Sequence, residues 1–328
     1  MIRAAFLIFL AACASAGSSI STTPARTSIV EDSTALAASG NVKLFGNIEL
    51  PAGRDPVPVV LIIAGSGPTD RNGNSKLLPG ANNSLKMIAE GLAARGIASL
   101  RYDKRGIGQS VAPGMKEEDL RFTTYIDDAE GWIRQLRADK RFSTIAVAGH
   151  SEGSLIGMVA AREAGADGYI SLEGAGRNIK EVLVEQLSAQ MQPSVIEQVR
   201  QIMAKIEAGQ KVDSIPVFLN ALFRPSVQPY LASWFKLTPA AEIAKLQVPV
   251  MIVQGTHDIQ TSLEDSKQLA AGAPNAKVLT VEGMNHVLKS TPAGRMEQGA
   301  SYSDPTIPVV PFLLDEMASF VKSLERAH

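Results

Sequence analysis

Short apolar runs recur along this chain, and most of them predict β-strands. Val57–Ala64 is continuously apolar, as expected of a parallel strand that is covered on both faces. Val42–Leu50 roughly alternates, which predicts an antiparallel edge strand or hairpin. Further short strands are predicted at Ile97–Tyr102, Thr144–Ala148, Gly168–Leu172, Val250–Val253 and Lys277–Val281.

Helical spacing separates most of these strands. In Thr124–Leu136 the apolar residues recur every three or four positions, and Thr124 with Asp127 resembles a capping box. Ser262 with Asp265 repeats that start signal before a later helix. Strands that alternate with helices predict a mostly parallel, twisted sheet with right-handed crossovers and flanking helices.

One stretch interrupts the alternation. Residues 178–244 contain no convincing buried strand but two apolar stripes at helical spacing, the second capped by Ser194 and Glu197. We therefore predict one α/β core built from residues 41–177 and 245–328, with a helical lid inserted between the two parts.

The N-terminus has the layout of a secretory signal over residues 1–16. Arg3 precedes the apolar run Ala4–Ala12, which is too short to span a membrane. The segment ending at Cys13 also resembles a bacterial lipobox, in which Cys13 becomes the lipidated first residue. Ordinary cleavage after Ala16 is the alternative.

The two alternatives predict different locations for an exported protein. Lipidation of Cys13 would anchor the chain to a membrane on the periplasmic side, and ordinary cleavage would leave it secreted or periplasmic. Residues 14–40 are rich in Ser, Thr and Ala, and we expect a flexible tether there, with ordered structure beginning near Asn41.

Composition narrows the function classes. The 328 residues are 45% hydrophobic and 20% charged, which is typical of a globular protein, and the formal net charge of −1 gives no reason to expect nucleic acid as a partner. Cys13 is the single cysteine, so the mature domain has no disulfide. No phosphate-binding glycine loop, paired metal ligands or nucleotide motif is present, and we expect no metal and no cofactor.

The most informative motif is G-x-S-x-G at Gly149, Ser151 and Gly153, between an apolar strand and a helical run. A serine at such a sharp turn sits in strained backbone geometry, where side chains two residues away on either side would collide. The turn would aim the Ser151 hydroxyl above the carboxyl end of the sheet, where α/β folds bind ligands. We therefore predict that Ser151 is a nucleophile.

A serine nucleophile needs a base and an acid that orients it. Asp258 and His286 each follow a predicted strand, and the chain order Ser, Asp, His is the one that this architecture requires. Glu173, which follows an earlier strand, is the alternative acid, or could hold a lid residue or substrate. The remaining histidines are less suitably placed: His150, His257 and His328.

The backbone N–H groups of Glu152 and Ser66 are the expected oxyanion donors, Ser66 because it lies in the small-residue loop after the first long parallel strand. A plain glycine-rich turn is the alternative reading of that loop. Two charged clusters, expected at the same edge of the sheet, could bind a substrate carboxylate or brace the site through ion pairs: Asp70, Arg71, Asp103 and Arg105.

These motifs together resemble the α/β-hydrolase superfamily over nearly all of residues 41–325, and within it bacterial serine aminopeptidase-like and esterase-type hydrolases. Besides the elbow, the resemblance rests on Gly65–Arg71, Leu100–Gly106 and Arg224–Tyr230. Ala64 departs from the pattern, because many relatives have histidine there. The resemblance implies an α/β-hydrolase fold and a poorly defined substrate range.

The predicted reaction is carboxylic ester hydrolysis through an acyl-Ser151 intermediate, with a small-molecule ester or amide as substrate. An aminopeptidase, amidase or thioesterase on the same triad is the alternative, and an aminopeptidase needs a carboxylate for the substrate ammonium, such as Glu173, Glu181 or Glu185. The alternative of another class is a surface lipoprotein that keeps the fold and only binds.

Overall fold

The protein is represented by a computed structural model, which describes residues 26–325. Its eight strands form one sheet in the order β1-β2-β4-β3-β5-β6-β7-β8. The β1–β2 and β2–β4 pairs are antiparallel, and all other neighbours are parallel. The strands are β1 Val30–Ala38, β2 Val42–Leu50, β3 Val57–Ile63, β4 Ala98–Tyr102, β5 Phe142–His150, β6 Gly168–Leu172, β7 Val250–Gly255 and β8 Lys277–Val281.

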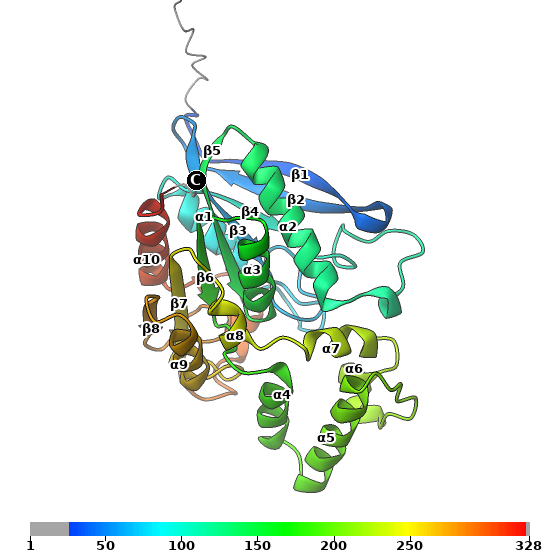
Figure 1. The fold of residues 1–328 in the computed structure, drawn as a ribbon. Coiled ribbons are helices and arrows are strands. Elements are labelled where there is room, and N and C mark those ends of the chain that lie inside the picture. The colour runs from blue at the N-terminus through cyan, green and yellow to red at the C-terminus, as the bar shows by residue number, and fades with distance from the viewer. Residues whose placement is uncertain (1–25, 326–328) are drawn as a thin grey trace, which may run out of the picture.

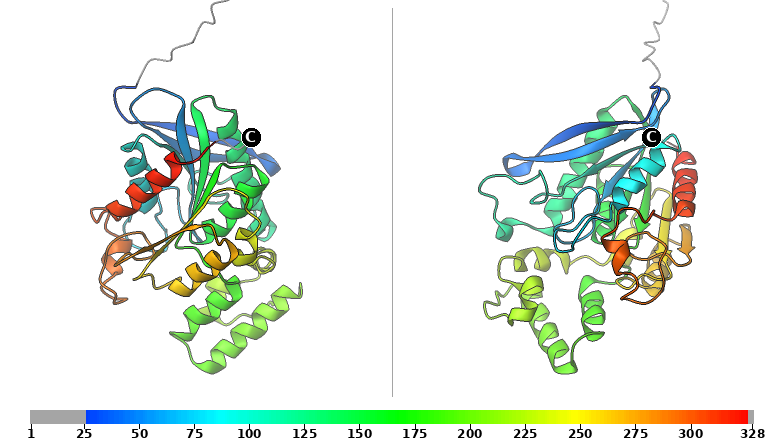
Figure 2. Two further views of the ribbon diagram at one scale, coloured as in Figure 1. Left: turned by 60° about the vertical axis from the view of Figure 1, so that its left-hand side comes forward. Right: turned by 180° about the vertical axis from the view of Figure 1, so that it is seen from behind.

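Helices cover both faces of this sheet (Figures 1 and 2). The core helices are α1 Ser84–Ala93, α2 Phe122–Ala138, α3 Glu152–Glu163, α9 Leu263–Gly272 and α10 Pro311–Lys322. Buried residues of α2, α3 and α9 pack on one face, and those of α1 and α10 pack on the other. Along β3, Val59 and Leu61 face the first cluster while Val60 and Ile62 face the second, which explains the continuous apolar run.

The first strand corrects one expectation. Residues 14–40 were expected to form a tether, but Val30–Ala38 forms β1 and pairs along its whole length with β2. Its side chains are mostly exposed or half-buried, so β1 lacks the apolar signal of an ordinary strand. Pairing with β2 supplies its backbone hydrogen bonds, and the partly buried Leu36 packs against the core. The signal segment and Cys13 lie outside the described residues.

The segment between β6 and β7 is helical, as its periodicity predicted. It contains α4 Ile179–Ser188, α5 Pro193–Glu207, α6 Asn220–Phe223, α7 Gln228–Trp234 and α8 Pro239–Ile243. Helices α4 to α6 project beyond one end of the sheet, in the lower part of Figure 1. Whether this insertion works as a lid stays a prediction. Every helix within residues 26–325 is too short or too polar to traverse a lipid bilayer.

Helix starts were predicted less well than helices. Ser262 and Asp265 form the expected capping box before α9. The other two predicted caps are wrong, because α2 begins at Phe122, before Thr124, and α5 begins at Pro193 with Gln192 as its N-cap. In α5 the proline at the first helical position sets the start, and Ser194 is already inside the helix.

Candidate active site

Ser151 lies in the tight turn between β5 and α3, with φ 55° and ψ −120°. The flanking glycines are required by close packing. A Cβ on Gly149 would lie 2.1 Å from the carbonyl oxygen of Gly153, and one on Gly153 would lie 2.4 Å from that of Ile63. The structure therefore gives the G-x-S-x-G motif the strained geometry of a nucleophile elbow.

Ser154, one helical turn further on, is the nearest alternative hydroxyl. Its side chain is 1% exposed, and its Oγ bonds to the hydroxyls of Tyr169 and Ser171, each 2.8 Å away. Ser151, in contrast, is half-buried. The elbow therefore presents one accessible hydroxyl at its tip.

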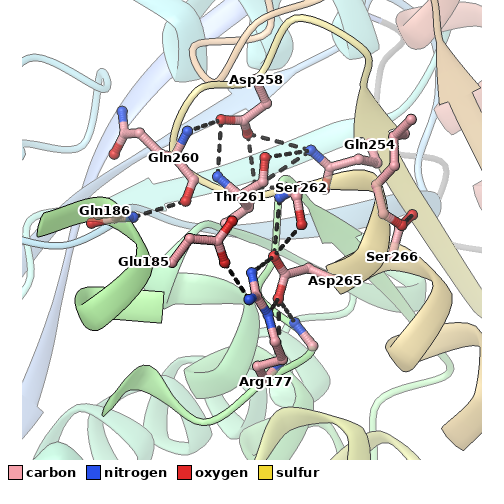
Figure 3. A network of polar contacts seen from close by, with 12 residues as sticks. Arg177, Glu185, Gln186, Gln254, Asp258, Gln260, Thr261, Ser262, Asp265 and Ser266 are labelled. Carbon is pink, nitrogen blue, oxygen red and sulfur yellow. Dashed lines mark hydrogen bonds and ion pairs between the residues drawn. The ribbon is translucent and has the colours of Figure 1, made fainter. Parts of the chain in front are cut away.

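Asp258 and His286 come from the loops after β7 and β8, and they are in contact. His286 Nδ1 lies 2.7 Å from Asp258 Oδ2, and both side chains are almost fully buried. The backbone N–H groups of Gln260 and Thr261 donate to the other Asp258 oxygen at 2.6 and 3.1 Å (Figure 3). Burial opposes ionisation of Asp258, but the adjacent His286 and these hydrogen bonds hold its pKa well below the ordinary range.

Glu173, the alternative acid, lies at the end of β6 behind Asp258. It is fully buried, has φ 49°, and accepts hydrogen bonds from Gly255 N at 2.8 Å and Gln254 Nε2 at 2.6 Å. Burial, together with the charge of Asp258, raises the pKa of Glu173 well above its usual value. The raised pKa favours the neutral form of Glu173, and both of its oxygens already accept hydrogen bonds from β7 residues, so it is less suited than Asp258 to orient His286.

His150 links the elbow to the histidine loop. Its Nε2 donates to the carbonyl oxygen of His286 at 2.6 Å, and the two rings lie 4.9 Å apart between centroids. Burial lowers the pKa of His150 to about 3, and the neighbouring His286 adds to this, so the ring is neutral. His286 thus lies next to the residue that precedes Ser151, and no hydrogen bond joins the Ser151 and His286 side chains among the described residues.

The two expected oxyanion donors flank Ser151. Glu152 is the first residue of α3, where backbone N–H groups have no partner within the helix. Gly65 packs against the elbow, because a Cβ on it would lie 3.1 Å from Ser151 Cβ, and Ser66 is the next residue. The N–H groups of Ser66 and Glu152 are donors in no hydrogen bond among residues 26–325.

The charged clusters are occupied by internal contacts. Arg71 donates from its backbone N and its Nη2 to the two oxygens of Asp103, at 2.9 and 2.6 Å. Arg105 makes a two-point ion pair with Asp128, at 3.0 and 2.5 Å. Asp70 accepts from the backbone of its own loop. These contacts fit the bracing alternative better than the binding of a substrate carboxylate.

Two residues next to the candidate active site, His150 and Lys104, make contacts that were not predicted from the sequence. His150 was set aside only as less suitably placed to act as the base, yet it hydrogen-bonds to the carbonyl oxygen of His286. Lys104 lies between Asp103 and Arg105, and nothing in the sequence marks it as buried, yet it is 1% exposed and bonds to Glu152.

No group of three or more His, Cys, Asp or Glu side chains suited to a metal occurs within the described range.

Comparison with known proteins agrees with this architecture. The family described as serine aminopeptidase, S33, matches residues 81–214, and the one described as TAP-like protein matches residues 233–295. Esterase EstD from Thermotoga maritima is 29% identical over 265 residues, which cover 78% of this chain and 62% of that protein. The chain thus spans less than two thirds of the length of this relative.

Solved structures are similar in fold at low sequence identity. Est1E from Butyrivibrio proteoclasticus with ferulic acid bound has a TM-score of 0.57 and 19% identity, covering 88% of this chain and 96% of that one. Esterase Pf2001 from Pyrococcus furiosus has a TM-score of 0.55 and 14% identity, covering 90% and 93%. With the sheet order and the elbow, these likenesses show that the chain is an α/β-hydrolase in fold.

Proposed function

We propose that this protein is a serine esterase that hydrolyses small or medium carboxylic esters. The observation that carries the proposal is the buried His286–Asp258 pair at 2.7 Å, whose histidine accepts a hydrogen bond at its backbone carbonyl from His150, the residue before Ser151. The hydrolase family matches and the esterase relatives support an ester hydrolase.

In the proposed reaction Ser151 Oγ attacks the ester carbonyl carbon while His286 Nε2 accepts the hydroxyl proton. Asp258 accepts a hydrogen bond from Nδ1–H, which leaves Nε2 free to act as a base and stabilises the imidazolium that forms. The N–H groups of Ser66 and Glu152 would stabilise the oxyanion. Collapse returns the proton to the departing alcohol, and water then attacks the acyl-Ser151 by the same route.

An aminopeptidase on the same triad is the second candidate, because the matching family is described as serine aminopeptidase. Such an enzyme needs a free carboxylate for the substrate ammonium. Glu173 is fully buried with both oxygens hydrogen-bonded, and its raised pKa disfavours the charged carboxylate, whereas Glu185 is paired with Arg177. Of the three carboxylates considered, this leaves only Glu181, which lies exposed in the first turn of α4. These contacts favour the esterase.

The two candidates are separated by kcat/KM for p-nitrophenyl esters against aminoacyl p-nitroanilides of matched size. We expect a preference of at least about 100-fold for the ester, equivalent to about 2.7 kcal/mol in activation free energy. His286→Gln should remove turnover of both substrates without unfolding the protein. A preference for the anilide would contradict the esterase assignment.

We also propose that the protein is exported and lipidated at Cys13, which fits the apolar run and the lipobox-like segment before that residue. The intact mass of the membrane-associated protein after expression in a bacterial host tests this. A mass gain of diacylglycerol and fatty acid on a chain beginning at Cys13, absent in Cys13→Ala, is expected. An unmodified mature chain beginning beyond Cys13 would show ordinary secretion instead.

A further inference from the structure

Lys104 is a buried ammonium that the proposed reaction does not use. It follows β4, is 1% exposed, and lies 5.1 Å from the centre of the Tyr125 ring. Its Nζ donates to the carbonyl oxygen of Gly65 at 2.7 Å and to Glu152 Oε2 at 2.6 Å. Burying an ammonium costs free energy unless the group is paired and hydrogen-bonded, and these two contacts offset that cost.

The contact with Gly65 fixes a peptide plane. The Gly65 carbonyl and the Ser66 N–H belong to one trans peptide, in which the two groups point in opposite directions. Drawing the Gly65 oxygen toward Lys104 therefore sets the direction of the Ser66 N–H. This plane lies against the elbow, since a Cβ on Gly65 would be 3.1 Å from Ser151 Cβ.

The contact with Glu152 ties the second expected donor to the same ammonium. Glu152 directly follows Ser151, and its side chain is held on one oxygen by Lys104 and on the other by the Tyr230 hydroxyl from α7. Both residues that would stabilise the oxyanion are thus connected through Lys104. Tyr230 extends the connection into the helical insertion.

We propose that Lys104 is a positioning residue that aligns the two oxyanion donors, Ser66 N–H and Glu152 N–H. It acts through the Gly65 carbonyl and the Glu152 carboxylate and does not touch the substrate. The inference rests on the proposed esterase function. It predicts that Lys104 contributes to transition-state stabilisation but neither to substrate binding nor to the basicity of His286.

The test is Lys104→Met in the full chain, with a p-nitrophenyl ester as substrate. Removing one oxyanion donor typically lowers kcat by about 100- to 1,000-fold, and a misdirected donor keeps part of its effect. We expect kcat to fall about 10- to 100-fold with KM and the pH profile unchanged. Inhibition by a trifluoromethyl ketone, which forms an oxyanion on Ser151, should weaken by a similar factor.

Lys180→Met is the matched control, because it removes a lysine from an ion pair with Glu207 on the insertion. We expect it to behave as the wild type. If Lys104→Met does not fold because Glu152 is left as a buried charge, Lys104→Met with Glu152→Gln removes that charge and should still lose kcat.

Three results would overturn the inference in a folded variant: an unchanged kcat, a rise in KM alone, or a shifted pH profile. Absence of ester turnover by the wild type would instead overturn the proposed function, and this inference with it. The two failures are therefore distinguishable.

Discussion

At the scale of single residues, two neighbouring carboxyls of the site have pKa values that are shifted in opposite directions. Glu173 and Asp258 follow neighbouring strands, and Gln254 Nε2 contacts both. Burial and the charge of Asp258 raise the pKa of Glu173, whereas His286 and several hydrogen bonds together outweigh burial and lower the pKa of Asp258. These shifts favour a neutral Glu173 beside an ionised Asp258, and the Asp258 carboxylate in turn orients the His286 imidazole.

Glu173→Gln tests this arrangement, because an amide mimics a protonated carboxyl. Above the ordinary glutamate pKa of about 4.3, unfolding the wild type releases the Glu173 proton, so stability falls as pH rises toward the raised pKa. The variant has no proton to release at this position, so it lacks this pH-dependent loss of stability. Its free energy of unfolding relative to the wild type should therefore increase by up to about 1.4 kcal/mol per pH unit, and its Tm should rise with it.

Thermal unfolding of both proteins between pH 4 and 8 measures the effect, with Glu181→Gln on the exposed face of α4 as the control. We expect Glu173→Gln to keep most of its esterase activity and Glu173→Leu to lose much of it. A Tm difference that stays constant across the pH range would show that Glu173 is ionised in the folded protein.

Residue chemistry was predictable where local sequence determines it. The glycines of the elbow and the order of Ser151, Asp258 and His286 follow from the steric and topological needs of the turn. The burial of Lys104 and the bond from His150 to the His286 carbonyl were not predictable, because each partner lies on a loop distant in sequence.

At the scale of elements, a partly buried ion pair joins the insertion to the core. Arg177, just before α4, binds Asp265 of α9 at 2.8 and 2.9 Å, and also pairs with Glu185 (Figure 3). Gln186 of α4 donates to the carbonyl oxygen of Gln260, two residues after Asp258. The base of the insertion is therefore connected to the loop that carries the proposed acid.

Arg177→Met should destabilise the protein, because it leaves the buried Asp265 carboxylate without its cation. We expect a loss of about 3 kcal/mol in the free energy of unfolding, and a smaller loss when Asp265→Asn is added. Urea denaturation followed by tryptophan fluorescence measures both.

Arg134→Met, which breaks an exposed pair with Glu130 on α2, is the control and should cost about 0.5 kcal/mol or less. If Arg177→Met costs no more than this control, the pair contributes nothing to the attachment of the insertion.

Elements with a strong apolar pattern were predicted within a few residues, including β3, β6 and β8. Strand β1 was missed because its polar, half-exposed sequence becomes a strand only by pairing with β2. The start of α2 was missed because Phe122 packs in the core, and this tertiary contact outweighs the local capping signal at Thr124.

At the scale of the whole molecule, the sheet brings together side chains that are far apart in sequence. β5, β6, β7 and β8 are consecutive neighbours, so Ser151, Glu173, Asp258 and His286 follow adjacent strands at one edge. This convergence was predictable from the alternation of strands and helices. The substrate was not, because the motifs specify the reacting groups and not the surface that binds the substrate.

The most direct test of the account is labelling of the folded protein with a fluorophosphonate, with the adduct located by peptide mass spectrometry. We predict one adduct, on Ser151, that is lost in Ser151→Ala, slowed at least about 100-fold in His286→Gln, and unchanged in Ser188→Ala on the exposed face of α4. An adduct on another residue, or no adduct on the folded wild type, would contradict the account.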